Sequence, residues 1–355
     1  MKSMFRKILL LSGCCVFCMI MLSCEHRPLE DPANAHYLRV YLDENLRNVT
    51  FGFYNQQYER PHYSTPRVMR AVLADPRTGR VVAERYLQNQ GTDEKGYYIE
   101  GYINAPPGTY NLLVYSYGAP YTMVRNENDY YTMQAYTNRA SDYYHKYMPE
   151  LMQRIDAGTI RQQPDHMFHE MMENIVIVRN QGVDTLRNAK GEHFTARSMV
   201  RSYYIQLKVK GIEWARSAVS VLSGMAGSSY MHRYDGMAAS DPAYVLFSLK
   251  QASRSRSSDG ESTTAVLYTT FSTFGKLAEE RNMLTVTFEF SKVDGTTQVE
   301  QVDITDMFAT PMVRDNQWIL LEHEVEIAPP DDSVIGGGMT PGVDDWTDIE
   351  SDIYL

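Results

Sequence analysis

Cysteine is scarce in this 355-residue chain and is confined to its first 24 residues, at positions 14, 15, 18 and 24. Beyond Cys24 the chain therefore has no disulfide, zinc finger or cysteine nucleophile. A Gly-x-Ser-x-Gly nucleophile elbow and a phosphate-binding loop are also missing, because the glycine run at residues 336–338 lacks the strand and helix that flank such a loop. We expect a protein that is not an enzyme and that uses no cofactor.

Basic residues do not gather into a patch. The chain carries 34 Lys and Arg against 44 Asp and Glu, and residues 331–355 hold seven acidic residues and no basic one. Without a basic stripe, nucleic-acid binding is not expected. We interpret residues 331–355 as an acidic tail in which the glycine run serves as a flexible hinge.

Long apolar runs are absent after residue 24. The run before it, residues 8–22, follows a basic start and has the length of a signal-peptide core, whereas a membrane-spanning helix needs roughly 20 residues. Residues 21–24 (Met-Leu-Ser-Cys) resemble the lipobox of bacterial lipoproteins, with Met in place of the usual Leu. This predicts a signal peptide over residues 1–23, lipidation of Cys24 and a tether over residues 24–35.

Two other interpretations of this leader remain. Residues 11–14 (Leu-Ser-Gly-Cys) match the lipobox better, but they leave only residues 8–11 as the apolar core. The second is an anchor helix that is never cleaved. A lipoprotein cysteine carries more than one acyl chain, and two or three chains bind a membrane almost permanently. We therefore expect the protein to be held to a membrane from the cell exterior by its lipid at Cys24.

Short runs of β-branched and aromatic residues recur along the rest of the chain, and most alternate with polar residues. They predict strands at residues 37–42, 48–54, 68–73, 80–87, 97–103, 110–117, 174–178, 202–210, 218–222, 243–249, 264–271, 283–290, 298–304 and 317–327. The pattern predicts an all-β protein with two domains in series, residues 36–194 and 195–330. We interpret each as a β-sandwich, although a barrel gives the same pattern.

Residues 119–165 interrupt this pattern. The segment is rich in Tyr, Asn and Met and does not alternate, so we interpret it as an irregular insertion in the first domain, with a short helix within residues 142–155. Aromatic faces can stack on sugar rings, but the alternative is that these side chains pack the insertion onto the sandwich. The tyrosines concerned are Tyr130, Tyr131, Tyr136, Tyr143, Tyr144 and Tyr147.

One cluster has the composition of a metal site. On a helix, His166, His169 and Glu173 would share a face, and imidazoles with a carboxylate suit zinc. Pro164 and the β-branched residues 175–178 argue against a continuous helix, so a solvated surface segment is the alternative and no metal is expected.

Several stretches are similar to one known family. They are residues 24–27 (Cys-Glu-His-Arg), 105–114, 209–212, 218–227, 270–275, 302–306 and 336–346. In this order they resemble the fimbrillin-like lipoproteins of the Bacteroidales, close to the anchor and accessory subunits of type V pili. The resemblance implies two tandem transthyretin-like β-sandwiches, a surface-exposed position on the outer membrane, and other fimbrial subunits as partners. It leaves open whether the chain is an anchor or a polymerising subunit.

Fimbrillin-like subunits join by donor-strand exchange, in which one subunit completes the sheet of another. The resemblance makes the end of the tail a possible donor strand, with Ile349, Ile353, Tyr354 and Leu355 as its apolar residues. Folding back on its own domain, or remaining disordered, is the alternative.

Two further expectations concern sugars. Residues 184–186 and 332–334 resemble the O-glycosylation sequon of these bacteria, with Thr185 and Ser333 as acceptors, although matches of three residues also arise by chance. As a second function, the lipid and the tyrosine-rich insertion fit a surface glycan-binding lipoprotein of a polysaccharide-uptake system.

Overall fold

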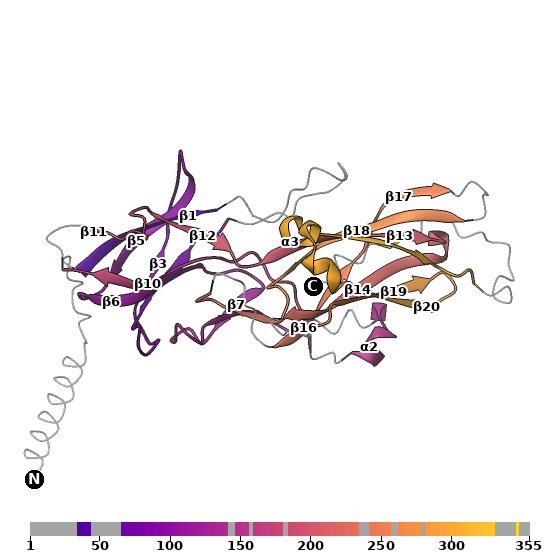
Figure 1. Ribbon diagram of the computed structural model, residues 1–355, viewed down its shortest axis with the longest axis horizontal. Helices are drawn as coiled ribbons and strands as arrows, with labels where there is room; N and C mark the ends of the chain where they lie inside the picture. Colours follow the sequence, from indigo (N-terminus) through magenta and orange to yellow (C-terminus); the bar gives the residue numbers. More distant parts are fainter. Residues whose placement is uncertain are drawn as a thin grey trace, which may run out of the picture.

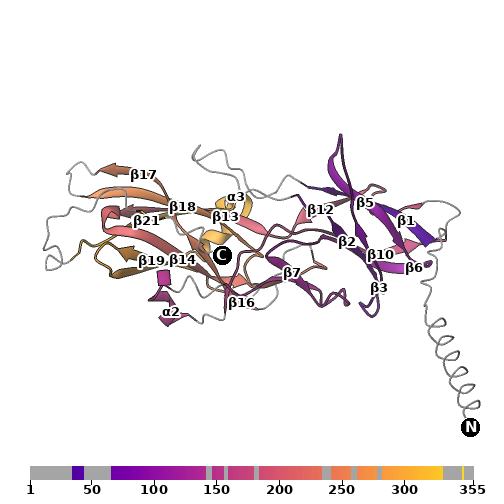
Figure 2. The same ribbon diagram turned by 180° about the vertical axis from the view of Figure 1, so that it is seen from behind.

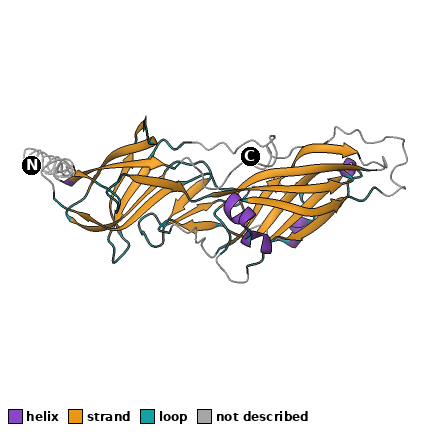
Figure 3. Cartoon of the chain, turned by 45° about the horizontal axis from the view of Figure 1, so that its top comes forward, coloured by secondary structure: helices purple, strands orange, loops and turns teal. Residues whose placement is uncertain are grey.

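The computed structural model describes residues 34–43, 65–140, 146–155, 159–179, 184–233, 241–256, 262–277, 282–330 and 346–347. Within them the chain is predominantly β, which confirms the predicted all-β class (Figure 3). Two sandwiches lie end to end along the long axis (Figures 1 and 2). Across the described ranges, no helix has the length and apolar character needed to cross a membrane.

The N-terminal sandwich is a nine-stranded sheet folded over its own core. Its path is β3-β2-β6-β10-β12-β1-β5-β4, with β11 beside β1. The strands are β1 (Ala35–Leu42), β2 (Met69–Ala74), β3 (Val81–Leu87), β4 (Asn89–Asp93), β5 (Gly96–Asn104), β6 (Gly108–Ser116), β10 (Phe168–Ile177), β11 (Asp184–Thr185) and β12 (Phe194–Ser198). The sheet turns its corner at β12, which pairs first with β1 and then with β10.

The alternation of β1 decides which side chains enter this core. Leu38 and Val40 are fully buried, while Tyr37 and Arg39 lie on the outer face, as the period of two for a strand requires. Leu112 and Phe194 meet β1 from β6 and β12 in the same core.

The C-terminal sandwich consists of two facing sheets, with strand orders β17-β18-β13-β21 and β20-β19-β14-β16-β9. Aromatic side chains fill its core, and the rings of Phe247 and Phe271 stack with centroids 4.5 Å apart. The elements are β13 (Arg201–Lys210), η4 (Ile212–Trp214), β14 (Ala215–Ala226), β16 (Pro242–Ser248), β17 (Lys250–Arg256), β18 (Thr263–Thr273), β19 (Thr285–Lys292), β20 (Thr297–Asp303), η5 (Asp306–Ala309), α3 (Pro311–Asn316) and β21 (Trp318–Glu326).

The 119–165 segment is shared between the two sandwiches. It contains β7 (Thr122–Arg125), β8 (Gln134–Thr137), the single-turn helix α2 (Leu151–Arg154) and β9 (Ile160–Arg161). β8 pairs with β15 (Ser228–Tyr230) from the second half of the chain, and β9 pairs in parallel with β16 at the edge of the C-terminal sheet. The segment therefore connects the sandwiches through backbone hydrogen bonds as well as side-chain packing.

A separate apolar cluster fills the junction between the sandwiches. Val72 and Leu113 from the N-terminal sandwich meet Met133 of the 119–165 segment and Met231 and Phe274 of the C-terminal half. All five side chains are nearly or completely buried. Because three parts of the chain contribute to one core, we expect the two sandwiches to move as one body.

Candidate functional site

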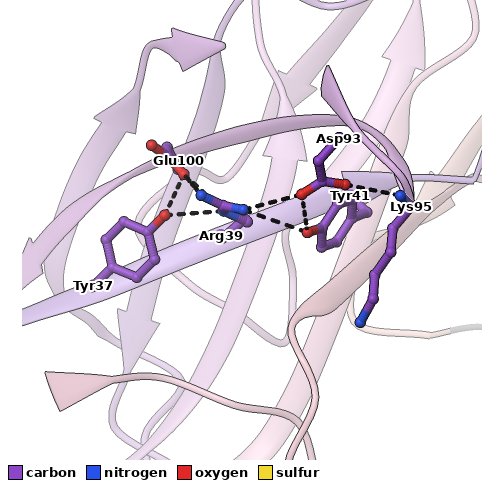
Figure 4. Close-up of polar contacts among 6 residues, drawn as sticks. All are labelled: Tyr37, Arg39, Tyr41, Asp93, Lys95 and Glu100. Atoms are coloured by element: carbon purple, nitrogen blue, oxygen red, sulfur yellow. Dashed lines mark hydrogen bonds and ion pairs between the residues drawn. The ribbon is translucent and has the colours of Figure 1, made fainter. Parts of the chain in front are cut away.

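The outer face of β1 and β5 carries an ordered row of polar and aromatic pairs (Figure 4). The antiparallel register places Tyr37 opposite Tyr102, Arg39 opposite Glu100, and Tyr41 opposite Tyr98. Directly opposed pairs on one face are close enough to interact and stabilise a sheet. The same alternation that buries one side of β1 therefore builds this surface on the other side.

Hydrogen bonds hold the central arginine from both sides. Arg39 donates from Nε to Oε2 of Glu100 at 2.7 Å and from Nη1 to Oδ2 of Asp93 at 3.2 Å. The hydroxyl of Tyr41 donates to the same Asp93 oxygen at 2.7 Å, and the hydroxyl of Tyr37 donates to Glu100. The guanidinium thus links two carboxylates of neighbouring strands, as Figure 4 shows.

Aromatic rings extend this network into a continuous row. The centroids of Tyr37 and Tyr102 are 5.6 Å apart and those of Tyr41 and Tyr98 are 5.7 Å apart, both edge to face. His193 lies between the two pairs, with its centroid 6.5 Å from that of Tyr37 and 6.0 Å from that of Tyr41. Such edge-to-face contacts add stability beyond the buried area.

Tyr98 is fixed by its neighbours on both sides. The guanidinium carbon of Arg39 lies 3.9 Å from the centroid of its ring, a cation–π contact. On the adjacent strand, a Cβ at Gly91 would lie 2.3 Å from the Tyr98 hydroxyl, so only glycine allows the ring to lie across β4. The row is therefore built with little freedom to rearrange.

Three titratable groups of the row have shifted pKa values. The hydrogen bonds from the Tyr41 hydroxyl and the Lys95 backbone lower the pKa of Asp93. Burial, followed by the hydrogen bond to Glu100, raises the pKa of Tyr37 to about 12. Burial and nearby cations lower the pKa of His193 below its ordinary 6.5. These groups suit binding better than proton transfer, because none is tuned toward pH 7.

A hollow of about 400 Å³ opens beside the row. Tyr41, Asp43, Lys95, Glu192 and His193 contribute to its lining. It therefore combines an aromatic wall with hydrogen-bond donors and acceptors.

Most of the predicted site residues lie outside the described ranges: Cys24, Ser333, Ile349, Ile353, Tyr354 and Leu355. Thr185 is described. It lies half-buried in β11, directly opposite Tyr37 of β1. This register puts the predicted glycosylation acceptor on the same outer face as the aromatic row.

The metal-like cluster lies on and beside strand β10 instead of on a helix. The ring nitrogens of His166 are 2.7 and 2.9 Å from the hydroxyl oxygens of Ser198 and Ser202, in the connection between the sandwiches. The buried His169 places Nδ1 3.1 Å from the carbonyl oxygen of Met231, whereas Glu173 is exposed. Within the described residues, no group of three or more His, Cys, Asp or Glu is arranged to hold a metal ion.

The insertion tyrosines that are described contribute mainly to packing. Tyr130 is fully buried in the junction cluster, and Tyr147 packs against the apolar cluster beneath α2. Tyr131 is more exposed, but its hydroxyl donates to the carbonyl oxygen of Pro76 at 2.5 Å. Sequence reasoning missed the tyrosines of β1 and β5, although both strands carry tyrosine, a charged residue and tyrosine at alternate positions.

One described part of the tail contacts its own sandwich. Trp346 packs against the C-terminal core, and the Thr347 N–H donates to the carbonyl oxygen of Arg216 at 2.7 Å. Arg216 is the extra residue of a bulge in β14 between Ala215 and Ser217. At these two residues the tail folds back.

Comparison with known proteins agrees with this architecture. A family model described as a domain of unknown function, DUF5119, matches residues 75–248, close to half of the chain. A Bacteroides ovatus protein provisionally named fimbrium anchoring subunit Fim4B is 23% identical over 274 residues, covering 69% of this chain and 74% of that protein. This chain is thus similar in sequence to a Bacteroides protein that is named as a fimbrial subunit. The resemblance predicted from the sequence is thereby confirmed.

One solved structure shows a shared fold, and a second is a weaker match. The crystal structure of an adhesin candidate from Bacteroides ovatus superposes with a TM-score of 0.57 at 19% identity, covering 87% of this chain and 98% of that one. The fimbrial anchor protein Mfa2 of Porphyromonas gingivalis matches with a TM-score of 0.44 at 10% identity, covering 80% of this chain and 88% of that one.

Proposed function

We propose that this protein is a lipid-anchored fimbrial subunit of the anchor or accessory type, attached to the outer membrane at Cys24 and joined to other fimbrial subunits. The relative named as a fimbrium anchoring subunit supports the fimbrial role. The leader sequence supports the lipid.

The direction of β1 is the observation that carries the proposal. At its start, Ala35 pairs with Asn104, at the end of the N-terminal sandwich remote from the junction. At its end, Leu42 pairs with Ala196, shortly before the chain enters the C-terminal sandwich. A lipid at Cys24 precedes Ala35 by about 11 residues, a reach of at most ~40 Å. It would hold the molecule by its far end, with the C-terminal sandwich directed away from the membrane (Figures 1 and 2).

An outward-facing C-terminal sandwich is available to partners. Among the described strands, β21 pairs only with β13, which leaves its other edge free for an added strand. The tail is the second element of strand donation, with residues 349–355 as the donor and the contacts of Trp346 and Thr347 holding it until a partner is present.

Substitution of the proposed lipid site tests the anchor role. Cys24→Ala should release the protein from the membrane fraction and shed fimbriae into the medium, because no acyl chain remains. Cys14→Ala is the matched control, since it changes the alternative lipobox and should leave the anchor in place. Membrane retention by Cys24→Ala with loss by Cys14→Ala would contradict the assignment.

Deletion of residues 343–355 tests strand donation separately. Loss of assembly with partner subunits is expected, while the Trp346→Ala variant keeps the donor and should assemble at least as well as the wild type. Unchanged assembly after the deletion would refute donation without affecting the lipid-anchor proposal.

A further inference from the structure

We propose that the outer face of β1 and β5, with the hollow beside it, is a binding site for a neutral saccharide. This proposal is independent of the fimbrial role. It also places the sugar site on strands other than those of the insertion, whose Tyr130 is buried.

The aromatic row supplies surfaces for sugar rings. Tyr102 is 47% exposed, and its ring continues through Tyr37 and His193 to Tyr41 at the hollow. Pyranose rings have apolar C–H faces that pack on such side chains, while hydroxyl groups at their edges need polar partners. The hydrogen bonds of Tyr37 and Tyr41 already fix both rings, so binding would cost little side-chain entropy.

The hollow supplies the polar partners. A sugar hydroxyl both donates and accepts a hydrogen bond, and the lining offers carboxylate acceptors at Asp43 and Glu192 beside the Lys95 ammonium donor. His193 contributes to the lining, and its buried Nδ1 has no hydrogen-bond partner among the described residues. A volume of about 400 Å³ falls within the range of small-molecule sites.

The balance of charged side chains around the hollow indicates which class of saccharide fits. Arg39 is engaged by Glu100 and Asp93, and Arg197 lies 3.7 Å from Asp43. Lys95 and the nearby Arg187 remain as cations, and Glu192 contributes a carboxylate to the lining of the same hollow. Sulfated, phosphorylated or sialylated sugars would therefore meet no excess of positive charge, which favours a neutral sugar.

Binding of the full-length lipidated protein, in detergent, to an array of neutral, sialylated and sulfated oligosaccharides tests the proposal. We expect neutral oligosaccharides to bind, and the strongest of them serves as the probe for calorimetry. Tyr102→Ala and the double variant Lys95→Ala/His193→Ala should each weaken binding at least tenfold, with only a small decrease in unfolding temperature.

Tyr86→Ala is the matched control. Tyr86 is similarly exposed, at 40%, and its ring contacts that of Tyr117 on a different face with centroids 5.0 Å apart. The affinity of the Tyr86→Ala variant for the oligosaccharide should equal that of the wild type. Absence of any neutral ligand, preference for sulfated or sialylated sugars, or equal losses in Tyr86→Ala and Tyr102→Ala would each overturn the proposal.

Discussion

The outer faces of the two sandwiches have opposite surroundings. On the N-terminal sandwich, the face of β1 and β5 is solvated and carries the row of tyrosines and charges. On the C-terminal sandwich, the face of β14 and β16 is covered, because Leu151 and Ile160 of the 119–165 segment pack on Val221 and Leu246. One face is free for a ligand, whereas the other joins the two sandwiches into one body.

The largest change in stability is expected on acidification, because His166 and His169 line the junction between the two sandwiches. Burial lowers the pKa of His166 to about 3 and that of His169 to about 4, well below the ordinary 6.5. The unfolded chain therefore binds more protons than the folded one below pH 6.5. Stability should be full above pH 6.5 and fall on acidification toward pH 4, by up to about 1.4 kcal/mol per pH unit for each histidine.

Urea unfolding from pH 7.5 to pH 4 measures this loss. The double variant His166→Gln/His169→Gln should show a much flatter pH dependence, because glutamine cannot be protonated there. An unchanged slope in that variant would show that other groups cause the loss.

Truncation of the covered face should cost more than truncation of the open face. Ile160 is fully buried, so Ile160→Ala should lower the free energy of unfolding by about 2–5 kcal/mol. Tyr102→Ala, on the open face, should cost about 1 kcal/mol or less. Chemical denaturation of both variants makes the comparison. Equal losses would contradict the difference between the faces.

Removal of the carboxylate that positions α2 should have an intermediate effect on stability. Glu289 of β19 is buried and accepts the backbone N–H groups of Glu150 and Leu151 at 3.1 and 2.8 Å. Glu289→Ala leaves both donors without this partner, at a cost of about 1–3 kcal/mol. Hydrogen exchange should show faster exchange at Leu151 than in the wild type, with the N-terminal sandwich unchanged. Protection that remains at Leu151 would mean that packing alone holds the helix.

The smallest change in the free energy of unfolding is expected from a substitution on the open face of β1 and β5. Arg39 is partly exposed and its ion pairs are accessible to solvent, so Arg39→Met should change stability by about 1 kcal/mol or less. The variant removes the cation beside Asp93, and the pKa of that carboxyl should rise, which NMR titration detects. A large loss of stability would show that the row is primarily a structural element.

The sequence predicted those strands whose hydrophobic pattern is visible in their own residues. β1 alternates, which indicates one solvated face, and residues 218–222 of β14 are apolar except for Ser220, a pattern typical of a strand covered on both faces. These residues do not predict which other segment of the chain covers the strand. β8 and β15 were missed because Gln134–Thr137 and Ser228–Tyr230 are short and pair with each other across a long stretch of the chain.

The candidate surface on β1 and β5 could be predicted only in part from the sequence. Tyrosine at alternate positions of β1 and β5 was visible, but the register that sets Arg39 opposite Glu100 depends on strand pairing. The alternative interpretation of the metal-like cluster as a solvated surface segment was wrong for His169, which is buried. The role of the two histidines in the junction depends on Ser198, Ser202 and Met231, which lie 32 to 62 positions away and which no local pattern connects to them.

Energy transfer from the protein to a membrane tests the orientation directly. The chain has no cysteine beyond Cys24, so Thr109→Cys and Thr296→Cys each give a single labelling site. Thr109 lies at the start of β6, shortly after Asn104, which pairs with Ala35 of β1, and Thr296 lies at the β19–β20 turn. In vesicles with acceptor-labelled lipid, the lipidated protein should show strong transfer from position 109 and weak transfer from position 296. Equal transfer, or stronger transfer from position 296, would contradict a C-terminal sandwich held away from the membrane.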